Sequence, residues 1–173
     1  HAVSVVKHAN PCGLAINDDQ AEAWRRAFAG DPVSAYGGIV GFNSTLTVKT
    51  ADAMKGIMLD VVVAPDYTEE ALELLQRRKQ TRVLRVDQDP KHALITHPIS
   101  GGILAQTPDV VEEDSACWRV VSERLPSAEE LSDLSFAWKA CQLIKSNAIV
   151  LANNNAIIGM GAGQPNRVTS VHL

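Results

Sequence analysis

The sequence lacks a surplus of basic residues. Its 173 residues carry 16 Lys and Arg against 20 Asp and Glu, which gives a net charge of −4. Proteins that bind nucleic acid without sequence preference neutralise phosphates with an excess of Lys and Arg. The charge balance therefore argues against a nucleic-acid partner.

Long hydrophobic runs are also missing. The longest apolar runs, at 61–65 and 148–152, have five residues, whereas a membrane-spanning helix needs about 20. No basic segment followed by an apolar stretch, the pattern of a secretory signal peptide, occurs near the first residue. We expect a cytoplasmic protein that does not enter a membrane.

Cysteine is scarce and scattered. The three cysteines, Cys12, Cys117 and Cys141, are widely spaced and form no Cys-x-x-Cys pair. This pattern favours free thiols over a disulfide framework or a zinc site. His8-Ala-Asn-Pro-Cys12 is similar to the zinc deaminase signature, but Asn10 stands at the Glu position and the second cysteine is absent. We predict no bound metal. The missing Glu and the missing second cysteine also exclude a nucleoside deaminase.

What is present is an alternation of β-branched runs with amphipathic segments. We expect strands at 2–8, 38–42 and 61–64 and helices at 19–30, 47–57 and 66–79. Asp19 and Asp66 are the predicted N-caps, with Glu22 completing a capping box and Gly30 in a left-handed C-terminal position. The alternation predicts an α/β fold with a parallel or mixed sheet.

The second half contains shorter elements. We expect short strands at 82–86, 93–97 and 102–106, and a hairpin of 148–152 with 156–160 across an Asn-rich turn. A capping box of Ser127 and Glu130 begins a helix that we expect to reach Lys145. On or beside its predicted apolar face are Leu131, Leu134, Trp138, Cys141 and Leu143/Ile144.

Lys7 and His8 end the first predicted strand, and the Asn10-Pro-Cys-Gly13 segment is expected to be a loop. Sites of open α/β sheets lie at the carboxyl ends of strands. A lysine there can stabilise developing negative charge while an imidazole moves a proton near neutral pH. The alternative is a solvated Lys7 and a His8 that forms only local hydrogen bonds.

Two further segments suit ligand contact. The turn-rich segment Asp31-Pro-Val-Ser-Ala-Tyr-Gly-Gly38 would let backbone amides approach a ligand, or it is a plain helix-to-strand connection. Asp60 begins an otherwise apolar strand and is either a strand-entry cap or a carboxylate that binds sugar hydroxyls.

The last segment, Gly159-Met-Gly-Ala-Gly-Gln-Pro-Asn-Arg167, is a loop rather than a dinucleotide fingerprint. That fingerprint requires a helix after the glycines, and Pro165 and the expected extended residues 168–171 argue against one. The loop presents Arg167, whose planar guanidinium can bind a carboxylate, phosphate or carboxamide oxygen. We expect Asn147 and Arg167 to meet, because the hairpin between them returns the chain to one end of the sheet.

Four segments together resemble one family. They are Val5-Val-Lys-His-Ala-Asn-Pro-Cys-Gly13, Asp31-Pro-Val-Ser-Ala-Tyr-Gly-Gly-Ile39, Lys145-Ser-Asn-Ala-Ile149 and Gly159-Met-Gly-Ala-Gly-Gln-Pro-Asn-Arg-Val168. In this order they are similar to the transformylase part of the bifunctional AICAR (phosphoribosylaminoimidazolecarboxamide) formyltransferase/IMP cyclohydrolase family of purine biosynthesis.

The resemblance implies transfer of a formyl group from 10-formyltetrahydrofolate, a co-substrate, to the 5-amine of AICAR. It implies that His8 transfers the proton and Lys7 stabilises the transition state. Nucleotide contacts are implied for Gly37, Asp60, Asn147 and Arg167, and folate contacts for Val168 and for Tyr36, which stands where many members have Phe. The implied fold is a three-layer α/β/α unit, cytidine-deaminase-like without zinc, in a homodimer with the active site at the interface.

The resemblance also implies that residues 1–173 are part of a transformylase domain. The family's cyclohydrolase domain and its C-terminal folate-binding segment have no counterpart in these residues, so we expect a chain taken from a longer protein and weak activity of the chain alone. A non-catalytic nucleotide-binding or interaction fragment is the alternative function.

The implied reaction suits the residues found. The amine is a weak nucleophile, so attack on the formyl carbon requires a base and a donor to the oxyanion. His8 fits the first role and Lys7 or Asn147 the second. Cys12 has no assigned role, because no residue that would lower its pKa can be placed beside it.

Overall fold

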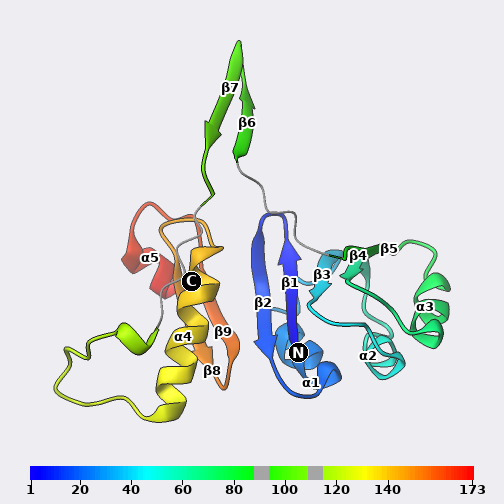
Figure 1. The fold of residues 1–173 in the computed structure, drawn as a ribbon, viewed down its shortest axis with the longest axis horizontal. Helices are drawn as coiled ribbons and strands as arrows, with labels where there is room; N and C mark the ends of the chain where they lie inside the picture. The colour runs from blue at the N-terminus through cyan, green and yellow to red at the C-terminus, as the bar shows by residue number, and fades with distance from the viewer. Residues whose placement is uncertain (88–93, 109–114) are drawn as a thin grey trace. The chain divides into compact units, whose positions relative to one another are not determined.

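A computed structural model describes residues 1–87, 94–108 and 115–173 (Figure 1). Contacts divide the chain into two units. The first consists of His1–Asp87 with Pro126–Leu173, and the described residues between them form the second.

The first unit has the following elements. Its strands are β1 (Ala2–Lys7), β2 (Asn10–Ile16), β3 (Gly38–Phe42), β4 (Leu59–Ala64), β5 (Arg82–Arg85), β8 (Ile149–Asn153) and β9 (Ala156–Gly161). Its helices are α1 (Gln20–Ala29), α2 (Val48–Ala53), α3 (Glu69–Gln76), α4 (Ala128–Gln142) and α5 (Arg167–His172). The second unit contains β6 (Ile95–Ile99) and β7 (Gly102–Gln106), which form an antiparallel pair, and a short 3₁₀ helix, η1 (Ser115–Cys117).

The first unit is built on one seven-stranded sheet in the order β5-β4-β3-β1-β2-β9-β8. Strands β3, β4 and β5 are parallel, because α2 and α3 return the chain between them. Strand β1 is antiparallel to both β2 and β3, and β9 is antiparallel to both β2 and β8. The predicted α/β fold with a mixed sheet is confirmed.

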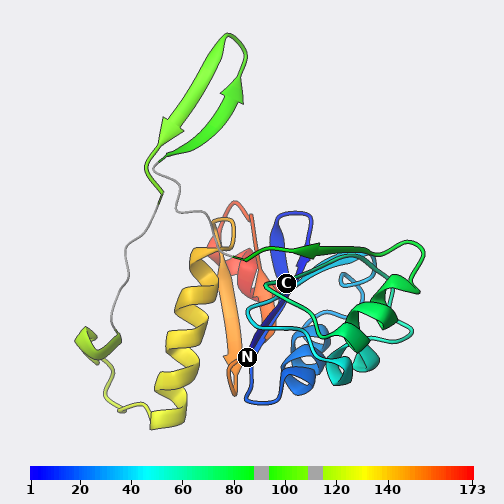
Figure 2. The same ribbon diagram turned by 45° about the vertical axis from the view of Figure 1, so that its right-hand side comes forward.

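Helices cover both faces of the sheet. Ala15 of β2 pairs with Ala156 of β9, and both belong to the core formed with α1 and the strands β1, β3 and β4. The next residue of β9, Ile157, packs with Phe136 and Ala140 of α4. Since neighbouring residues of a strand point to opposite faces, α1 and α4 lie on opposite sides. The turned view in Figure 2 shows α4 along β8 and β9.

The expected loop at Asn10–Gly13 is wrong, because these residues begin β2. Val6 pairs with Pro11 and Val5 with Gly13, so Cys12 is the extra residue of a bulge. A bulge accommodates a proline inside a strand. A Cβ on Gly13 would lie 1.8 Å from the Ala27 carbonyl oxygen of α1, so this glycine permits close helix packing rather than a loop.

The expected extended segment 168–171 is also wrong, because it lies in α5. The N-cap Asn166 accepts a hydrogen bond from the Thr169 amide. A Cβ on Gly161 of β9 would lie 1.9 Å from the Ser170 carbonyl oxygen, so α5 packs directly on the strand backbone. The close packing of α5 on Gly161 therefore outweighs the strand preference of the β-branched residues in this segment, since that preference depends on context.

Three predicted helix ends need correction. Gly30 has a right-handed conformation, with φ −60°. Asp19 does cap α1, but its own amide donates to Asn17, while Glu22 pairs with Arg25 instead of completing a box. Helix α3 is capped by Thr68 and not by Asp66, since the Thr68 hydroxyl accepts from the Ala71 amide.

Helix α4 begins with the predicted capping box of Ser127 and Glu130 but ends at Gln142, short of Lys145. Ile144 of its predicted apolar face is buried, but the rest of that prediction is wrong for Leu134 and Trp138, which are each 52% exposed, whereas Phe136 and Ala140 are buried. The helix is apolar on two sides, and the sequence pattern alone does not say which side meets the sheet.

The Asn-rich hairpin is confirmed. Asn154 and Asn155, between β8 and β9, have φ of 51° and 55°. Two consecutive residues with positive φ match the twist of a two-residue hairpin turn, and Asn adopts that conformation more readily than most residues. Asp133 of α4 accepts hydrogen bonds from both Asn amides and so ties the turn to the helix.

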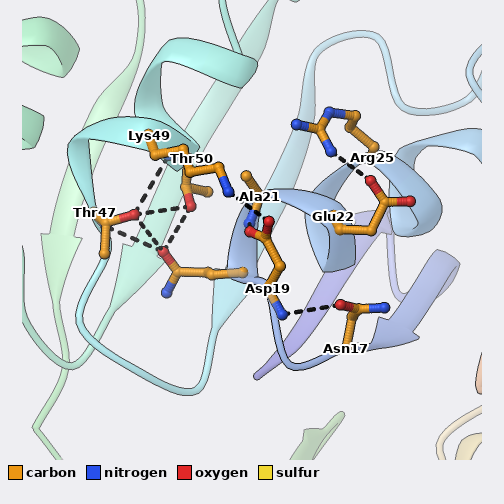
Figure 3. Close-up of polar contacts among 9 residues, drawn as sticks. Asn17, Asp19, Ala21, Glu22, Arg25, Thr47, Lys49 and Thr50 are labelled. Atoms are coloured by element: carbon orange, nitrogen blue, oxygen red, sulfur yellow. Dashed lines mark hydrogen bonds and ion pairs between the residues drawn. The ribbon is translucent and has the colours of Figure 1, made fainter.

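A buried polar cluster joins α1 to α2 (Figure 3). The Gln20 side-chain oxygen accepts from the Thr50 hydroxyl at 2.8 Å and from the Thr47 amide at 3.1 Å. The Gln20 amide group donates to Ser44 and to the Thr45 carbonyl. Every polar atom of a side chain that is 4% exposed is thus satisfied, which is the condition for burying it.

We predict that Gln20→Leu lowers the free energy of unfolding by about 2–4 kcal/mol, because it removes the acceptor of the partly buried Thr47 amide and of the buried Thr50 hydroxyl. Urea unfolding followed by circular dichroism measures the change. Glu22→Gln, which removes an exposed ion pair on the same helix, is the control and should be close to neutral. Equal effects of the two substitutions would contradict the role of the cluster.

Candidate active site

The candidate residues gather at one edge of the seven-stranded sheet. Val6 pairs with Ile39, so the end of β1 lies beside the start of β3, and β4 starts at the same edge because it is parallel to β3. The start of β2, the end of β9 and the start of β8 follow along this edge. In Figure 1 the β1–β2 turn is at the upper side of the sheet and the β8–β9 turn at the lower.

Strand direction corrects one expectation. Lys7 lies at the carboxyl end of β1, as predicted, but Gly37 and Asp60 lie at the amino ends of β3 and β4. The site edge is thus not the carboxyl edge of a parallel sheet. It exists because β1 runs against β3 and carries its last residues to where its neighbours begin.

Lys7, Gly37 and Asp60 meet closely. The Lys7 ammonium donates to the Tyr36 carbonyl oxygen at 2.6 Å. A Cβ on Gly37 would lie 3.5 Å from Lys7 Nζ and 3.6 Å from Asp60 Oδ1, so a cation and a carboxylate face the same glycine. Gly37 has φ +64°, a conformation that side chains rarely adopt. A backbone position without a side chain therefore lies between two opposite charges.

The Asp31–Gly38 segment is an ordered series of turns. The Asp31 carboxylate accepts from the Ser34 amide, and the Ala35 amide donates to the Asp31 carbonyl. The Gly38 amide donates to the Ala35 carbonyl, which completes the series. Hydrogen bonds from the Ser34 hydroxyl and amide hold the pKa of Asp31 below its usual value. These turns present Tyr36, which is 66% exposed, next to Gly37.

His8 occupies the two-residue turn between β1 and β2. Lys7 pairs with Asn10, so only His8 and Ala9 form the turn. His8 is exposed and has φ +56°. A non-glycine residue with positive φ is uncommon, and such residues concentrate at functional sites. His8 lies outside β1, so the rule that neighbouring strand residues point to opposite faces does not apply to the Lys7–His8 pair.

Asn10 joins the two halves of the site. Its side-chain oxygen accepts from the Lys145 amide at 3.4 Å, which links the β1–β2 turn to the segment before β8. This contact joins residues 135 positions apart, so it is not evident from the sequence. An Asn directly after a possible tight turn is the one local signal that could have indicated it.

Asn147 is bound to the loop that follows β9. Its side-chain nitrogen donates to the carbonyls of Gln164 at 2.9 Å and Pro165 at 3.0 Å, and the Gly163 amide donates to Lys145. Two carbonyl acceptors fix the orientation of the amide. Both its N–H donors are used, so Asn147 is unsuited to hold an oxyanion, and its Oδ1 can accept a hydrogen bond from a ligand instead.

Arg167 begins α5, two residues after Pro165, whose carbonyl binds Asn147. The predicted approach of the Asn147 and Arg167 segments is therefore confirmed at the level of the backbone. Arg167 and Val168 are both exposed, and the Ser170 hydroxyl donates to the Asn147 carbonyl, which ties α5 to the same segment.

Cys12 is buried beneath this edge. Its thiol donates to the Val5 carbonyl at 3.4 Å, and burial, together with the charge of Asp31, raises its pKa. A thiol whose pKa is raised is a weak nucleophile at neutral pH, which agrees with leaving Cys12 without a catalytic role. Among the described residues, no three His, Cys, Asp or Glu side chains are grouped so as to hold a metal ion. No helix in the described ranges is both long and apolar enough to cross a membrane.

Comparison with known proteins gives a consistent result. The family model of the AICARFT/IMPCHase bienzyme matches residues 1–173. The chain is 47% identical, over 99% of its length, to the bifunctional purine biosynthesis protein purH of Dictyostelium discoideum. It is 45% identical, over 97% of its length, to the protein of this name from Lactobacillus delbrueckii subsp. bulgaricus, and 44% identical over 96% to that of a Thermoanaerobacter species. It spans about a third of the length of these curated relatives.

The hydrogen bonds of Asn147 predict a pH-dependent effect. Asn147→Asp places carboxylate oxygen against two carbonyl oxygens, so the free energy of unfolding should fall by about 2–3 kcal/mol at neutral pH. The folded state would raise the pKa of this carboxyl above its unfolded value of about 3.9. Folded protein then binds the proton more readily, so the loss should shrink as pH falls through the folded pKa.

Urea unfolding of this variant and of Asn147→Ala at several pH values measures the effect. Asn147→Ala should destabilise the protein without that pH dependence. Parallel pH profiles of the two variants would contradict the assigned hydrogen bonds.

Proposed function

Because the chain belongs to the AICARFT/IMPCHase bienzyme family, we propose that it serves formyl transfer from 10-formyltetrahydrofolate to the 5-amine of AICAR, a step of purine biosynthesis. The observation that carries the proposal is the meeting of Lys7, Gly37 and Asp60 beside the His8 turn. These groups supply a proton acceptor, a cation and a polar backbone position within one edge of the sheet.

The chemistry requires two kinds of help. The aminoimidazole amine has its lone pair drawn into the ring, so its attack on the formyl carbon is slow. As the C–N bond forms, the formyl oxygen gains negative charge and the amine must lose a proton. The tetrahedral intermediate then collapses, and the formyl carbon separates from the folate nitrogen, which takes up a proton.

Lys7 is the proposed donor to the oxyanion. An ammonium group has three N–H donors, and the Tyr36 carbonyl accepts one. The other two remain for a substrate oxygen. Asn147, the alternative donor, has both side-chain N–H groups engaged by loop carbonyls, which favours Lys7.

His8 is the proposed proton acceptor. Its imidazole lies in the turn next to Lys7 and is exposed, so it can reach a bound substrate. A neutral imidazole has a lone pair on one ring nitrogen, which can accept the proton that the amine loses. The departing proton reaches it from the amine directly or through the substrate carboxamide.

The nucleotide is proposed to bind along the same edge. The Gly37 backbone lies close to the ligand because it has no side chain, and the Asp60 carboxylate accepts hydrogen bonds from ribose hydroxyls. Asn147 Oδ1 accepts from a substrate N–H or hydroxyl. Arg167 offers a planar guanidinium to a carboxamide or phosphate oxygen.

The folate co-substrate is proposed to lie over Tyr36 and Val168, each 66% exposed. No metal takes part in this proposal. We also propose, from the family alone, a cytidine-deaminase-like fold without zinc, a cytoplasmic homodimer with the active site at its interface, and residues 1–173 as part of a transformylase domain. Because the chain spans about a third of its relatives, a nucleotide-binding fragment without turnover is the second candidate.

The role of His8 is tested by His8→Ala in the polypeptide that carries this region together with the remainder of the family's length. We expect kcat for formyl transfer to fall by about 10²–10⁴, the usual contribution of a general acid–base group. Release of tetrahydrofolate measures the rate. His172→Ala, at the exposed end of α5, is the control and should retain the rate. A His8→Ala protein with most of its activity would exclude His8 as the base.

The nucleotide site is tested by isothermal titration of AICAR into the 173-residue chain. Arg167→Lys keeps the charge but loses the planar fork, so the Kd should rise by about 10-fold. Lys139→Arg on α4 is the control. Binding of AICAR without formyl transfer by this chain would support the binding-fragment candidate, and no change in Kd for Arg167→Lys would exclude the Arg167 contact.

A further inference from the structure

An open cleft with two cationic side chains, Arg78 and Lys79, adjoins the candidate site. This cleft of about 380 Å³ is lined by residues 56–59, which lead into β4, and residues 78–81, which lead into β5. The Gly37 amide donates to the carbonyl of Met58, a lining residue, at 3.0 Å. One hydrogen bond therefore separates the cleft from the glycine that lies between Lys7 and Asp60.

The cleft has one sign of charge. Arg78 and Lys79 line it, and its eight lining residues include no Asp or Glu. Thr81 donates its hydroxyl to the Leu59 carbonyl, which holds the two walls together. A Cβ on Gly56 would meet nothing within 4 Å, so this wall is open to a ligand.

Arg78 is a half-buried cation without a counter-ion in the described part of the chain. Its guanidinium donates to the carbonyls of Ile57 at 3.1 Å and of Met54. These bonds use two of five N–H donors, and no described carboxylate forms an ion pair with it. Burial lowers the pKa of Arg78, which reflects the cost of keeping the charge there. An anion would offset that cost.

We propose that this cleft is a subsite for an anionic group of a substrate bound at the neighbouring edge, held by Arg78 and Lys79. The inference rests on the proposed function, whose two substrates both carry such a group. One is the pair of carboxylates on the glutamate portion of the folate, and the other is the 5′-phosphate of the nucleotide. Both present oxygens that accept charge-assisted hydrogen bonds from guanidinium and ammonium groups.

Position favours the folate glutamate as the source. Tyr36, proposed to contact the folate, directly precedes Gly37, whose amide binds Met58 in the cleft wall. The Tyr36 side chain is exposed on this edge. A ligand that lies over Tyr36 therefore has a short path to Arg78 and Lys79.

The test measures Kd by isothermal titration into the 173-residue chain with two matched ligand pairs. The first is 10-formyltetrahydrofolate and the same compound without its glutamate. The second is AICAR and its nucleoside, which lacks the phosphate. The variants are Lys79→Gln, Arg78→Gln and, as a control that removes one exposed charge on α4, Lys139→Gln. Urea unfolding checks that the Arg78→Gln protein remains folded. If that protein is unfolded, the test depends on Lys79→Gln alone, because Lys79 is exposed and its substitution should not affect folding.

We expect Lys79→Gln to weaken binding of the glutamate-bearing folate about three- to fivefold, and of the compound without glutamate less than twofold. Arg78→Gln should raise the Kd of the glutamate-bearing folate about tenfold. Lys139→Gln should leave the Kd values of both folate compounds unchanged. The same pattern in the AICAR pair instead would support the subsite with phosphate as its anion.

Two results overturn the proposal. If Lys79→Gln raises the Kd of both members of each pair equally, or changes neither value, the cleft binds neither anion. The proposed function is unaffected by that result. If the unmodified chain binds none of the four compounds, the titrations are repeated with the polypeptide of the family's full length, and absence of binding there as well overturns both the proposed function and the subsite.

Discussion

The candidate site depends on the two-residue turn between β1 and β2. His8 and Ala9 alone reverse the chain, so β2 lies antiparallel beside β1, and β3 pairs antiparallel with the other side of β1 at the centre of the sheet. Its last residue, Lys7, thereby reaches the edge at which β3 and β4 begin. A longer connection would leave Lys7 and His8 free to move relative to Gly37, and the short turn instead holds them on a strand paired on both sides. Chemistry at a strand end gains positional precision from such pairing.

Glycine serves two different purposes around this site. Gly13 and Gly161 let α1 and α5 lie directly on strand backbone, since any side chain there would overlap a helix carbonyl. Gly37 instead leaves space between charged side chains, where a ligand can approach the backbone. The first purpose positions the elements and the second leaves room for chemistry. Substitution of Gly13 or Gly161 should lower stability, whereas substitution of Gly37, whose φ is +64°, should affect both stability and ligand binding.

Charge of both signs is distributed along the edge, which suits the two anionic substrates of the proposed function. Lys7 and Asp60 both lie close to Gly37, whereas Arg78 and Lys79 line the adjoining cleft. The carboxylate suits hydroxyl groups and the cations suit oxyanions. This separation of charge would orient a substrate that carries both hydroxyl groups and an oxyanion. Only one direction of binding places the hydroxyl groups at the carboxylate and the oxyanion at the cations.

The sequence alone determined the local elements and the residue types of the site. Capping of α4 by Ser127, the Asn turn between β8 and β9 and the apolar strands follow from short-range chemistry, and the structure confirms them. Tertiary structure decided what depends on neighbours distant in sequence. It made Asn10–Gly13 a strand through pairing with β1, and residues 168–171 a helix by packing on Gly161. It also placed the Asn147 side-chain amide where it donates hydrogen bonds to two loop carbonyls. Each of these outcomes is set by a contact between segments that no local pattern encodes, because strand pairing and close packing outweigh residue preferences of about 1 kcal/mol.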